Sequence, residues 1–152
     1  MYALTANLTK VQAAVAEHFD CPSVEYFPLE LSGGQGSYMY HWEATFMGYD
    51  FMTAQVSQHM KITKISLALF EDSGWYMPNY DLAEDMWWGK NRGCDFVHHK
   101  KCPMGDRQSN ETGEFCIFTD SNDFSFGCDV DGDTMIQCTT TGSVFSEGCP
   151  IR

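Results

Sequence analysis

Residues 31–54 read "LSGGQGSYMYHWEATFMGYDFMTA", a glycine-rich loop followed by His41 and, eleven residues later, by Met52. Glycine adopts backbone conformations that other residues avoid, so we expect the glycines to shape a loop that delivers the chain to His41. A lone histidine beside a tryptophan is more often a packing residue than a ligand. The stretch therefore raises two candidate interpretations, a nucleotide-binding loop or a histidine site.

The nucleotide interpretation rests on the five letters LSGGQ at residues 31–35, which spell the signature of ABC-type ATPases. That signature acts on a γ-phosphate held by a P-loop, G-x-x-x-x-G-K-[ST], whose lysine contacts the phosphates. The sequence contains no such motif, and "GSYMYHWE" offers no basic group. We therefore reject a nucleotide site and expect a flexible loop.

Composition and charge narrow the class of protein. The chain has 152 residues, of which 43% are hydrophobic and 14% aromatic, so it can bury a core as one domain or as a domain with an appendage. The formal net charge is −12, with only nine Lys and Arg residues. This balance argues against nucleic-acid partners and against docking on anionic lipid.

Seven cysteines, six of them from Cys94 onward, suggest a disulfide framework formed in an oxidising compartment. No C-x-x-C pair occurs, which disfavours a thiolate zinc knuckle, and the odd count means that one cysteine is free or has its partner outside this chain. Two N-x-T sequons, at Asn7 and Asn110, fit a secreted protein. The start "MYALTANLTK" does not resemble an export signal, and no run of 18 apolar residues occurs. We therefore expect this chain to be part of a longer protein.

Periodicity predicts two helices. The first spans 9–19, opened by a T-x-x-Q capping box of Thr9 and Gln12. The second spans 58–73 and stops at Gly74. Their expected buried positions are Val11, Ala14, Val15, His18 and Phe19 in the first, and Ile62, Ile65, Ala68 and Leu69 in the second. Residues 74–94 are expected to lie irregularly over the core, and short strands are expected near 114–119 and 134–140. A domain boundary is placed near residue 92.

Other candidate sites are weaker than His41. "DVDGDT" at 129–134 fails the EF-hand frame and favours an acidic hairpin turn. His98 and His99 are adjacent, so they point in different directions and are expected on a solvated surface. His18 is expected at the edge of the core, and His59 at the start of the second helix.

The spacing from His41 to Met52 is typical of metzincins, in which a third zinc-binding histidine is followed by a Met-turn. The sequence resembles the leishmanolysin family of zinc metallopeptidases over residues 10–102, and more loosely beyond. The matching motifs occur in order as C-P-S, a Gly-rich loop, H-W-E, the Met-turn, E-D-S-G-W-Y, A-E, W-G and G-C-D-F; they begin at Cys21, Gly33, His41, Met52, Glu71, Ala83, Trp88 and Gly93.

The resemblance implies an α+β fold: a mainly helical C-terminal metzincin subdomain (1–92) followed by a small, truncated, disulfide-rich domain with short strands (93–152). It implies that His41 is the third zinc ligand and Met52 the Met-turn methionine. It also implies the disulfides Cys21–Cys94, Cys116–Cys138 and Cys102–Cys149, with the partner of Cys128 further downstream. The implied partners are polypeptide substrates, and the implied location is extracellular or at the cell surface. Membrane association of the parent protein would use an anchor not present here.

The sequence departs from the family in one respect that decides mechanism. The motif H-E-x-x-H, which supplies two zinc ligands and the general-base glutamate, does not occur. We therefore assign no catalytic residue, regard Glu43 as structural, and expect the chain alone to be inactive and to bind zinc weakly or not at all. The alternative is a non-catalytic extracellular binding or adhesion module on the same scaffold. A small inhibitor or toxin is disfavoured, because 90 or so residues precede the cysteine cluster.

Overall fold

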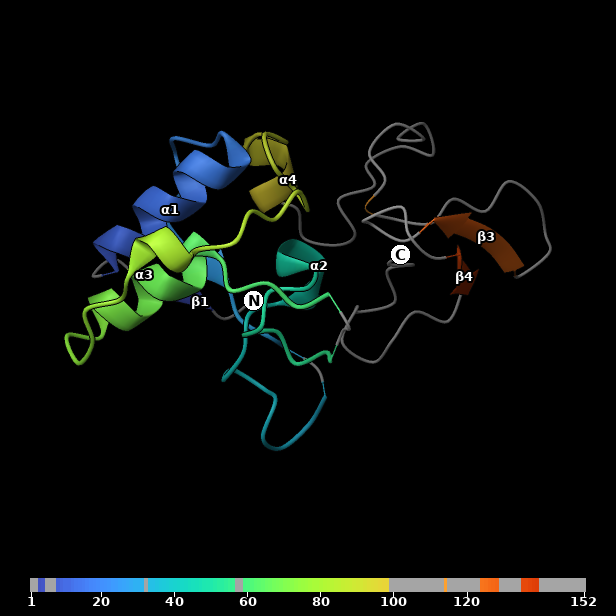
Figure 1. The fold of residues 1–152 in the computed structure, drawn as a ribbon, viewed down its shortest axis with the longest axis horizontal. Helices are drawn as coiled ribbons and strands as arrows, with labels where there is room; N and C mark the ends of the chain where they lie inside the picture. Colours follow the sequence, from blue (N-terminus) through green and yellow to red (C-terminus); the bar gives the residue numbers. More distant parts are fainter. Residues whose placement is uncertain are drawn as a thin grey trace.

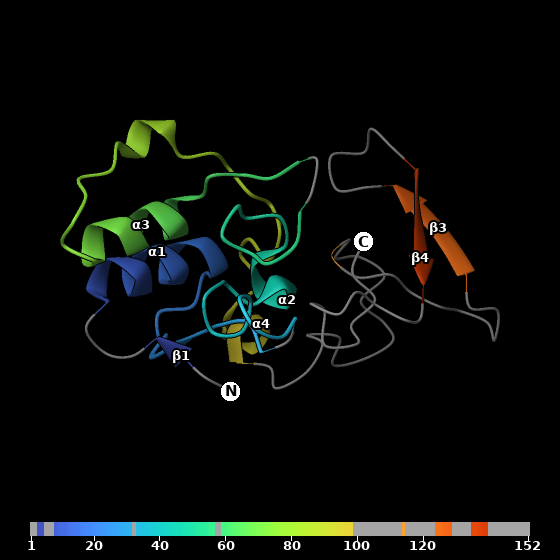
Figure 2. The same ribbon diagram turned by 90° about the horizontal axis from the view of Figure 1, so that it is seen from below.

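Two helices, α1 (Thr9–Phe19) and α3 (Lys64–Asp72), lie side by side, at the left of both views of the described structure (Figures 1 and 2). The structure is a computed structural model, and it describes residues 3–4, 8–31, 33–56, 59–98, 114, 124–128 and 135–139. The other elements are α2 (Ala44–Met47), the 3₁₀-helix η1 (Tyr80–Leu82), α4 (Cys94–His98), and strands β1 (Ala3–Leu4), β2 (Phe27–Pro28), β3 (Phe124–Cys128) and β4 (Met135–Thr139).

The predicted first helix is confirmed as α1, but its predicted capping box is wrong. Leu8 stands at the N-cap without a side-chain cap, and the Gln12 side chain instead donates to the Glu25 carbonyl at 3.2 Å. The carboxylate of Asp72, at the end of α3, accepts the free N–H groups of Lys10 (3.2 Å) and Val11 (2.9 Å). One helix therefore caps the other, a tertiary contact that a local motif cannot reveal.

The second helix begins at Lys64, later than predicted, with Thr63 as its N-cap. Lys61 pairs with the segment 49–51 instead, since its N–H donates to the Tyr49 carbonyl and its own carbonyl accepts from the N–H of Phe51, both at 2.9 Å. This pairing keeps the backbone out of the helix. As a result Ile62 is exposed rather than buried, and His59 precedes the helix rather than opening it. The helix ends as predicted before Gly74, which has φ of 73°.

The core lies between the helices and the irregular segments that follow them. Ile65 and Ala68 of α3, the helix that packs against α1, are buried. Trp88, in the irregular segment predicted to cover the core, is fully buried. Further buried members are Val11, Val15, Phe19, Phe27, Trp42, Phe46, Met47, Met86, Phe96 and Val97. The segment after Trp88 also closes the end of α1, because Gly93 donates to the carbonyl of Phe19 at 2.6 Å.

Two small antiparallel sheets complete the described residues. β1 pairs with β2, and β3 pairs with β4 in a register that sets Cys128 opposite Met135. β4 confirms the strand predicted near 134–140, and its pairing with β3 matches the expected hairpin. Both views place this hairpin to one side of the helices (Figures 1 and 2). Among the described residues, no helix is long and apolar enough to span a bilayer.

Several predicted features lie outside the described residues. These are the sequons at Asn7 and Asn110, the cysteines Cys102, Cys116 and Cys149, His99, and most of the strand predicted at 114–119. Glu114 is described and almost fully buried, and its carboxylate accepts from the guanidinium of Arg92 at 2.9 and 3.2 Å.

Candidate functional site

Backbone hydrogen bonds of Glu30, which precedes the glycine-rich loop, hold the two ends of that loop together. The Glu30 N–H donates to the carbonyl of His41 at 2.9 Å, and its carbonyl accepts from the N–H of Met39 at 2.8 Å. Gly33, Gly34 and Gly36 all have positive φ, between 74° and 99°, which non-glycine residues rarely adopt. The two ends of the loop are therefore held together by backbone hydrogen bonds, and His41 lies at its C-terminal end.

His41 is half-buried, and one of its ring nitrogens is engaged. Nδ1 lies 3.2 Å from the carbonyl oxygen of Ser37, so it must carry the hydrogen and donate. This tautomer leaves the Nε2 lone pair available to a metal. A backbone carbonyl that orients the second nitrogen is the usual support of a metal-binding imidazole. The residue therefore fits a zinc ligand that binds through Nε2.

The structure brings the backbone of Met52 directly beside that of His41. The N–H of Trp42 donates to the carbonyl of Met52 at 3.0 Å, and Trp42 forms a parallel bridge with Thr53. The Met52 side chain is partly buried and packs against the core. The eleven-residue separation in sequence thus becomes a pair of adjacent backbone segments.

A buried carboxylate, Asp50, holds this pair of segments against α3. Its oxygens accept from the N–H of Met52 (2.7 Å), from the hydroxyl of Ser66 (2.7 Å) and from the hydroxyl of Thr63 (2.5 Å). The Ser66 hydroxyl in turn accepts from the indole N–H of Trp42 at 2.8 Å. One chain of hydrogen bonds therefore runs from the backbone of Met52 through α3 to the residue next to His41.

Burial is the largest influence on the ionisation of Asp50 and raises its pKa above the usual value. The hydrogen bonds from Thr63, Ser66 and Met52 oppose this effect, because they stabilise the ionised form. All three donors still need an acceptor inside the protein, so Asp50 has a structural role beside its charge.

Glu43 has a local structural role. It is buried and stands at the N-cap of α2, where its carboxylate accepts from the hydroxyl (3.2 Å) and the N–H (3.5 Å) of Thr45. These contacts fix the turn that follows His41.

The described residues do not gather a zinc site around His41. Their one group of three potential ligands consists of Cys21, Cys94 and His98, which does not include His41. His18 is half-buried, and its Nε2 donates to the carbonyl of Trp88 at 2.7 Å. Burial lowers the pKa of His18, although that hydrogen bond opposes the effect. Around His41, the described residues thus supply one potential ligand, His41 itself, and the Ser37 carbonyl that contacts its ring.

Sequence reasoning missed two features of this region. Asp50, Ser66 and Thr63 are ordinary polar residues in sequence, and only the fold shows that they share one network. His98 was expected on a solvated surface but is half-buried, with Nε2 3.9 Å from Cys21 Sγ. Its spacing from Cys94, four residues along a helix, was the available signal.

Comparison with known proteins gives a consistent result. The family model described as leishmanolysin matches residues 2–144. A leishmanolysin-like peptidase of Caenorhabditis elegans is 41% identical over 100 residues, covering 60% of this chain and 15% of the relative. One from Drosophila pseudoobscura pseudoobscura is 33% identical over 133 residues, covering 85% and 19%. A leishmanolysin homolog of Crithidia fasciculata is 32% identical over 139 residues, covering 91% and 20%. The chain thus spans a fifth or less of the length of these relatives.

Proposed function

This chain belongs to the leishmanolysin family, a family of zinc metallopeptidases, and on that premise we propose that it is the C-terminal part of a zinc metalloendopeptidase. The substrates of that enzyme are polypeptides. Residues 1–92 form the metzincin subdomain that completes the zinc site, and residues 93–152 belong to a cysteine-rich domain.

His41 is the third zinc ligand, binding through Nε2. The carbonyl of Ser37 orients its ring, as the 3.2 Å contact at Nδ1 indicates. Zinc held by His41 and two further ligands would supply Lewis acidity, which would polarise a peptide carbonyl and lower the pKa of a bound water. The other two ligands and the general base belong to an H-E-x-x-H helix, a motif that this sequence does not contain.

The residues of this chain position His41 rather than carry out proton transfer. Met52 forms the floor beside the ligand, and the Asp50 network ties that floor to α3. The glycine-rich loop and Glu43 fix the chain on either side of His41. The observation that carries the proposal is the hydrogen bond from Trp42 to Met52, which holds the ligand next to the Met-turn.

We place the protein outside the cell or at its surface. The Cys21–Cys94 disulfide that the resemblance implied is present and joins the end of α1 to the start of α4. Such a cross-link is characteristic of oxidising compartments.

Two measurements test the proposed function. Sequencing the transcript upstream of Met1 should reveal an in-frame H-E-x-x-H; a frame closed by stop codons would instead favour a non-catalytic binding module. The chain as it stands, dialysed and analysed for metal, should retain well under one equivalent of zinc and should not cleave casein. Stoichiometric zinc with chelator-sensitive cleavage would show that the chain holds a complete site of its own.

A further inference from the structure

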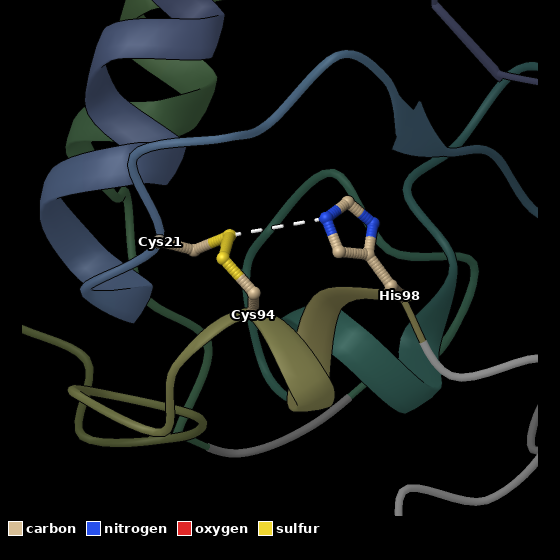
Figure 3. A group of neighbouring side chains, drawn as sticks. All are labelled: Cys21, Cys94 and His98. Carbon is tan, nitrogen blue, oxygen red and sulfur yellow. Dashed lines mark hydrogen bonds between the residues drawn. A yellow bond between two sulfur atoms is a disulfide. The ribbon is translucent and has the colours of Figure 1, made fainter.

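A second group of potential metal ligands lies where α1 ends and α4 begins. Cys21 follows α1, while Cys94 opens α4 and His98 ends it (Figure 3). One ligand atom of each residue lies within 4.8 Å of the others. Cys21 and Cys94 are 73 residues apart in the sequence, and a disulfide joins them.

In the disulfide form, the two sulfurs are uncharged and are poor metal ligands, since a thiolate is the form that binds. Figure 3 shows the His98 imidazole pointing toward the sulfur of Cys21, at 3.9 Å from Nε2. The imidazole thus already lies beside the sulfurs, and the disulfide bond is what prevents the two sulfurs from binding a metal.

We propose that reduction of this disulfide creates a zinc site formed by Cys21 Sγ, Cys94 Sγ and His98 Nε2. A dithiol supplies two electrons and two protons; the sulfur–sulfur bond breaks, two thiols form, and the dithiol becomes a disulfide. Zinc then binds both sulfurs, and each thiol releases its proton to water.

The geometry suits this metal. In a tetrahedral site with Zn–S of about 2.3 Å and Zn–N of about 2.05 Å, sulfur and nitrogen ligands lie about 3.6 Å apart and two sulfurs about 3.8 Å apart. The distance from Cys21 Sγ to His98 Nε2 is 3.9 Å, within a few tenths of that value. Once the bond is broken, the sulfurs need only move to ordinary contact distance. Two thiolates and one imidazole are a donor set that zinc prefers.

The hydroxyl of Ser23 lies beside the two sulfurs. Its Oγ is 3.2 Å from Cys94 Sγ and 3.9 Å from Cys21 Sγ. There it can donate a hydrogen bond to a thiolate, which stabilises the charged ligand. Three protein ligands leave a fourth zinc position for water.

Zinc would preserve the link between α1 and α4 when the disulfide is lost. Phe19 and Phe96, whose ring centroids are 5.6 Å apart, pack together beside that link. In either redox state the two helix ends then remain tethered through the same cysteines.

The test uses the full chain reduced with a phosphine, with and without zinc, followed by brief iodoacetamide treatment and mass spectrometry of peptides. Cys94 is the reporter, because it is partly exposed whereas Cys21 is buried. We expect zinc to slow alkylation of Cys94 by about tenfold or more, since a metal-bound thiolate is shielded. His98→Ala should abolish the protection, and His59→Ala, which removes an imidazole outside the group, should leave it intact.

Cobalt provides a second measurement on the same samples. The reduced chain should show a sulfur-to-cobalt charge-transfer band that weakens in His98→Gln. This variant also replaces His98→Ala if that protein does not fold. Equal alkylation of Cys94 with and without zinc would overturn the proposal, whether the reduced chain unfolds or simply binds no metal. Equal protection of all seven cysteines, or protection that survives His98→Gln, would overturn it as well.

Discussion

Removal of the Asp50 carboxylate is the sharpest perturbation of the segment around Met52, because two buried donors and one partly buried donor depend on it. In Asp50→Ala, the N–H of Met52 and the hydroxyls of Ser66 and Thr63 lose their acceptor. An unsatisfied buried donor costs about 1–3 kcal/mol, and the three share one network, so we expect a total loss of about 3–5 kcal/mol.

Asp50→Asn should be much milder, by about 1 kcal/mol, because the amide can replace most of the contacts. Its oxygen can take the place of the carboxylate oxygen that accepts from Met52 and Ser66. Its NH₂ group can then donate to the Thr63 hydroxyl, which rotates to accept. The order of the two variants is therefore a test of the hydrogen-bond pattern itself.

The assay is urea unfolding followed by far-UV circular dichroism, with the disulfide kept intact. Asp85→Ala is the matched control, because Asp85 is exposed and pairs with Lys90 at 2.7 Å; it should change stability by less than about 0.5 kcal/mol. The reasoning is refuted if Asp50→Ala lies within about 1 kcal/mol of Asp85→Ala, or if Asp50→Asn is the more damaging change.

The ionisation of Asp50 adds a pH signature. Burial raises its pKa above the ordinary 3.8, so the folded state favours the neutral form. The corresponding stability is present below that value and is lost as pH rises through the raised pKa. Asp50→Asn should lack this loss, so the stability difference between wild type and variant should change over that range. A constant difference would contradict the raised pKa.

Three further perturbations test other parts of the fold. Asp72→Ala removes the cap of α1 and should cost about 0.5–2 kcal/mol in urea unfolding; no effect would show that the cross-helix cap contributes nothing. Gly48→Ala should cost more than about 2 kcal/mol in the same assay, because the added Cβ would lie 2.7 Å from the Trp88 ring at a φ of 50°; an unchanged midpoint would refute this close approach. Burial lowers the pKa of His18 below 6.5, so the chain should lose stability as pH falls from that value through the lowered pKa, and His18→Gln should not. NMR titration of the His18 ring checks the direction, and a pKa above 6.5 would contradict it.

The features predicted well from sequence depend on local pattern. The apolar stripe of α1 gave its bounds and its buried face, because a helix of that length repeats the pattern over several turns. Gly74 indicated the end of α3, because helices often end at a position with positive φ and glycine adopts that conformation readily. The ordered motifs that include His41 and Met52 gave the leishmanolysin family, which the family comparison confirms, whereas the role of His41 as a zinc ligand stays a prediction.

The features missed depend on contacts between distant segments. The start of α3 is set by the backbone pairing of Lys61 with Tyr49 and Phe51. This pairing keeps the residues before Lys64 out of the helix, although their sequence pattern is helical. The cap of α1 comes from Asp72, some sixty residues away, rather than from Thr9. The Asp50 network and the approach of His98 to the disulfide arise in the same way. Long-range polar pairing has no signature in one sequence, which is why these residues were not predicted.

The central claim, that His41 is a zinc ligand held beside the Met-turn, is tested most directly by metal analysis of the full product of the open reading frame. Zinc content should be measured in parallel for wild type, His41→Ala and His59→Ala after dialysis. We expect about one equivalent of zinc in wild type and in His59→Ala, and loss of that zinc in His41→Ala, since removal of one of three protein ligands opens the site. Full retention of zinc by His41→Ala would contradict it.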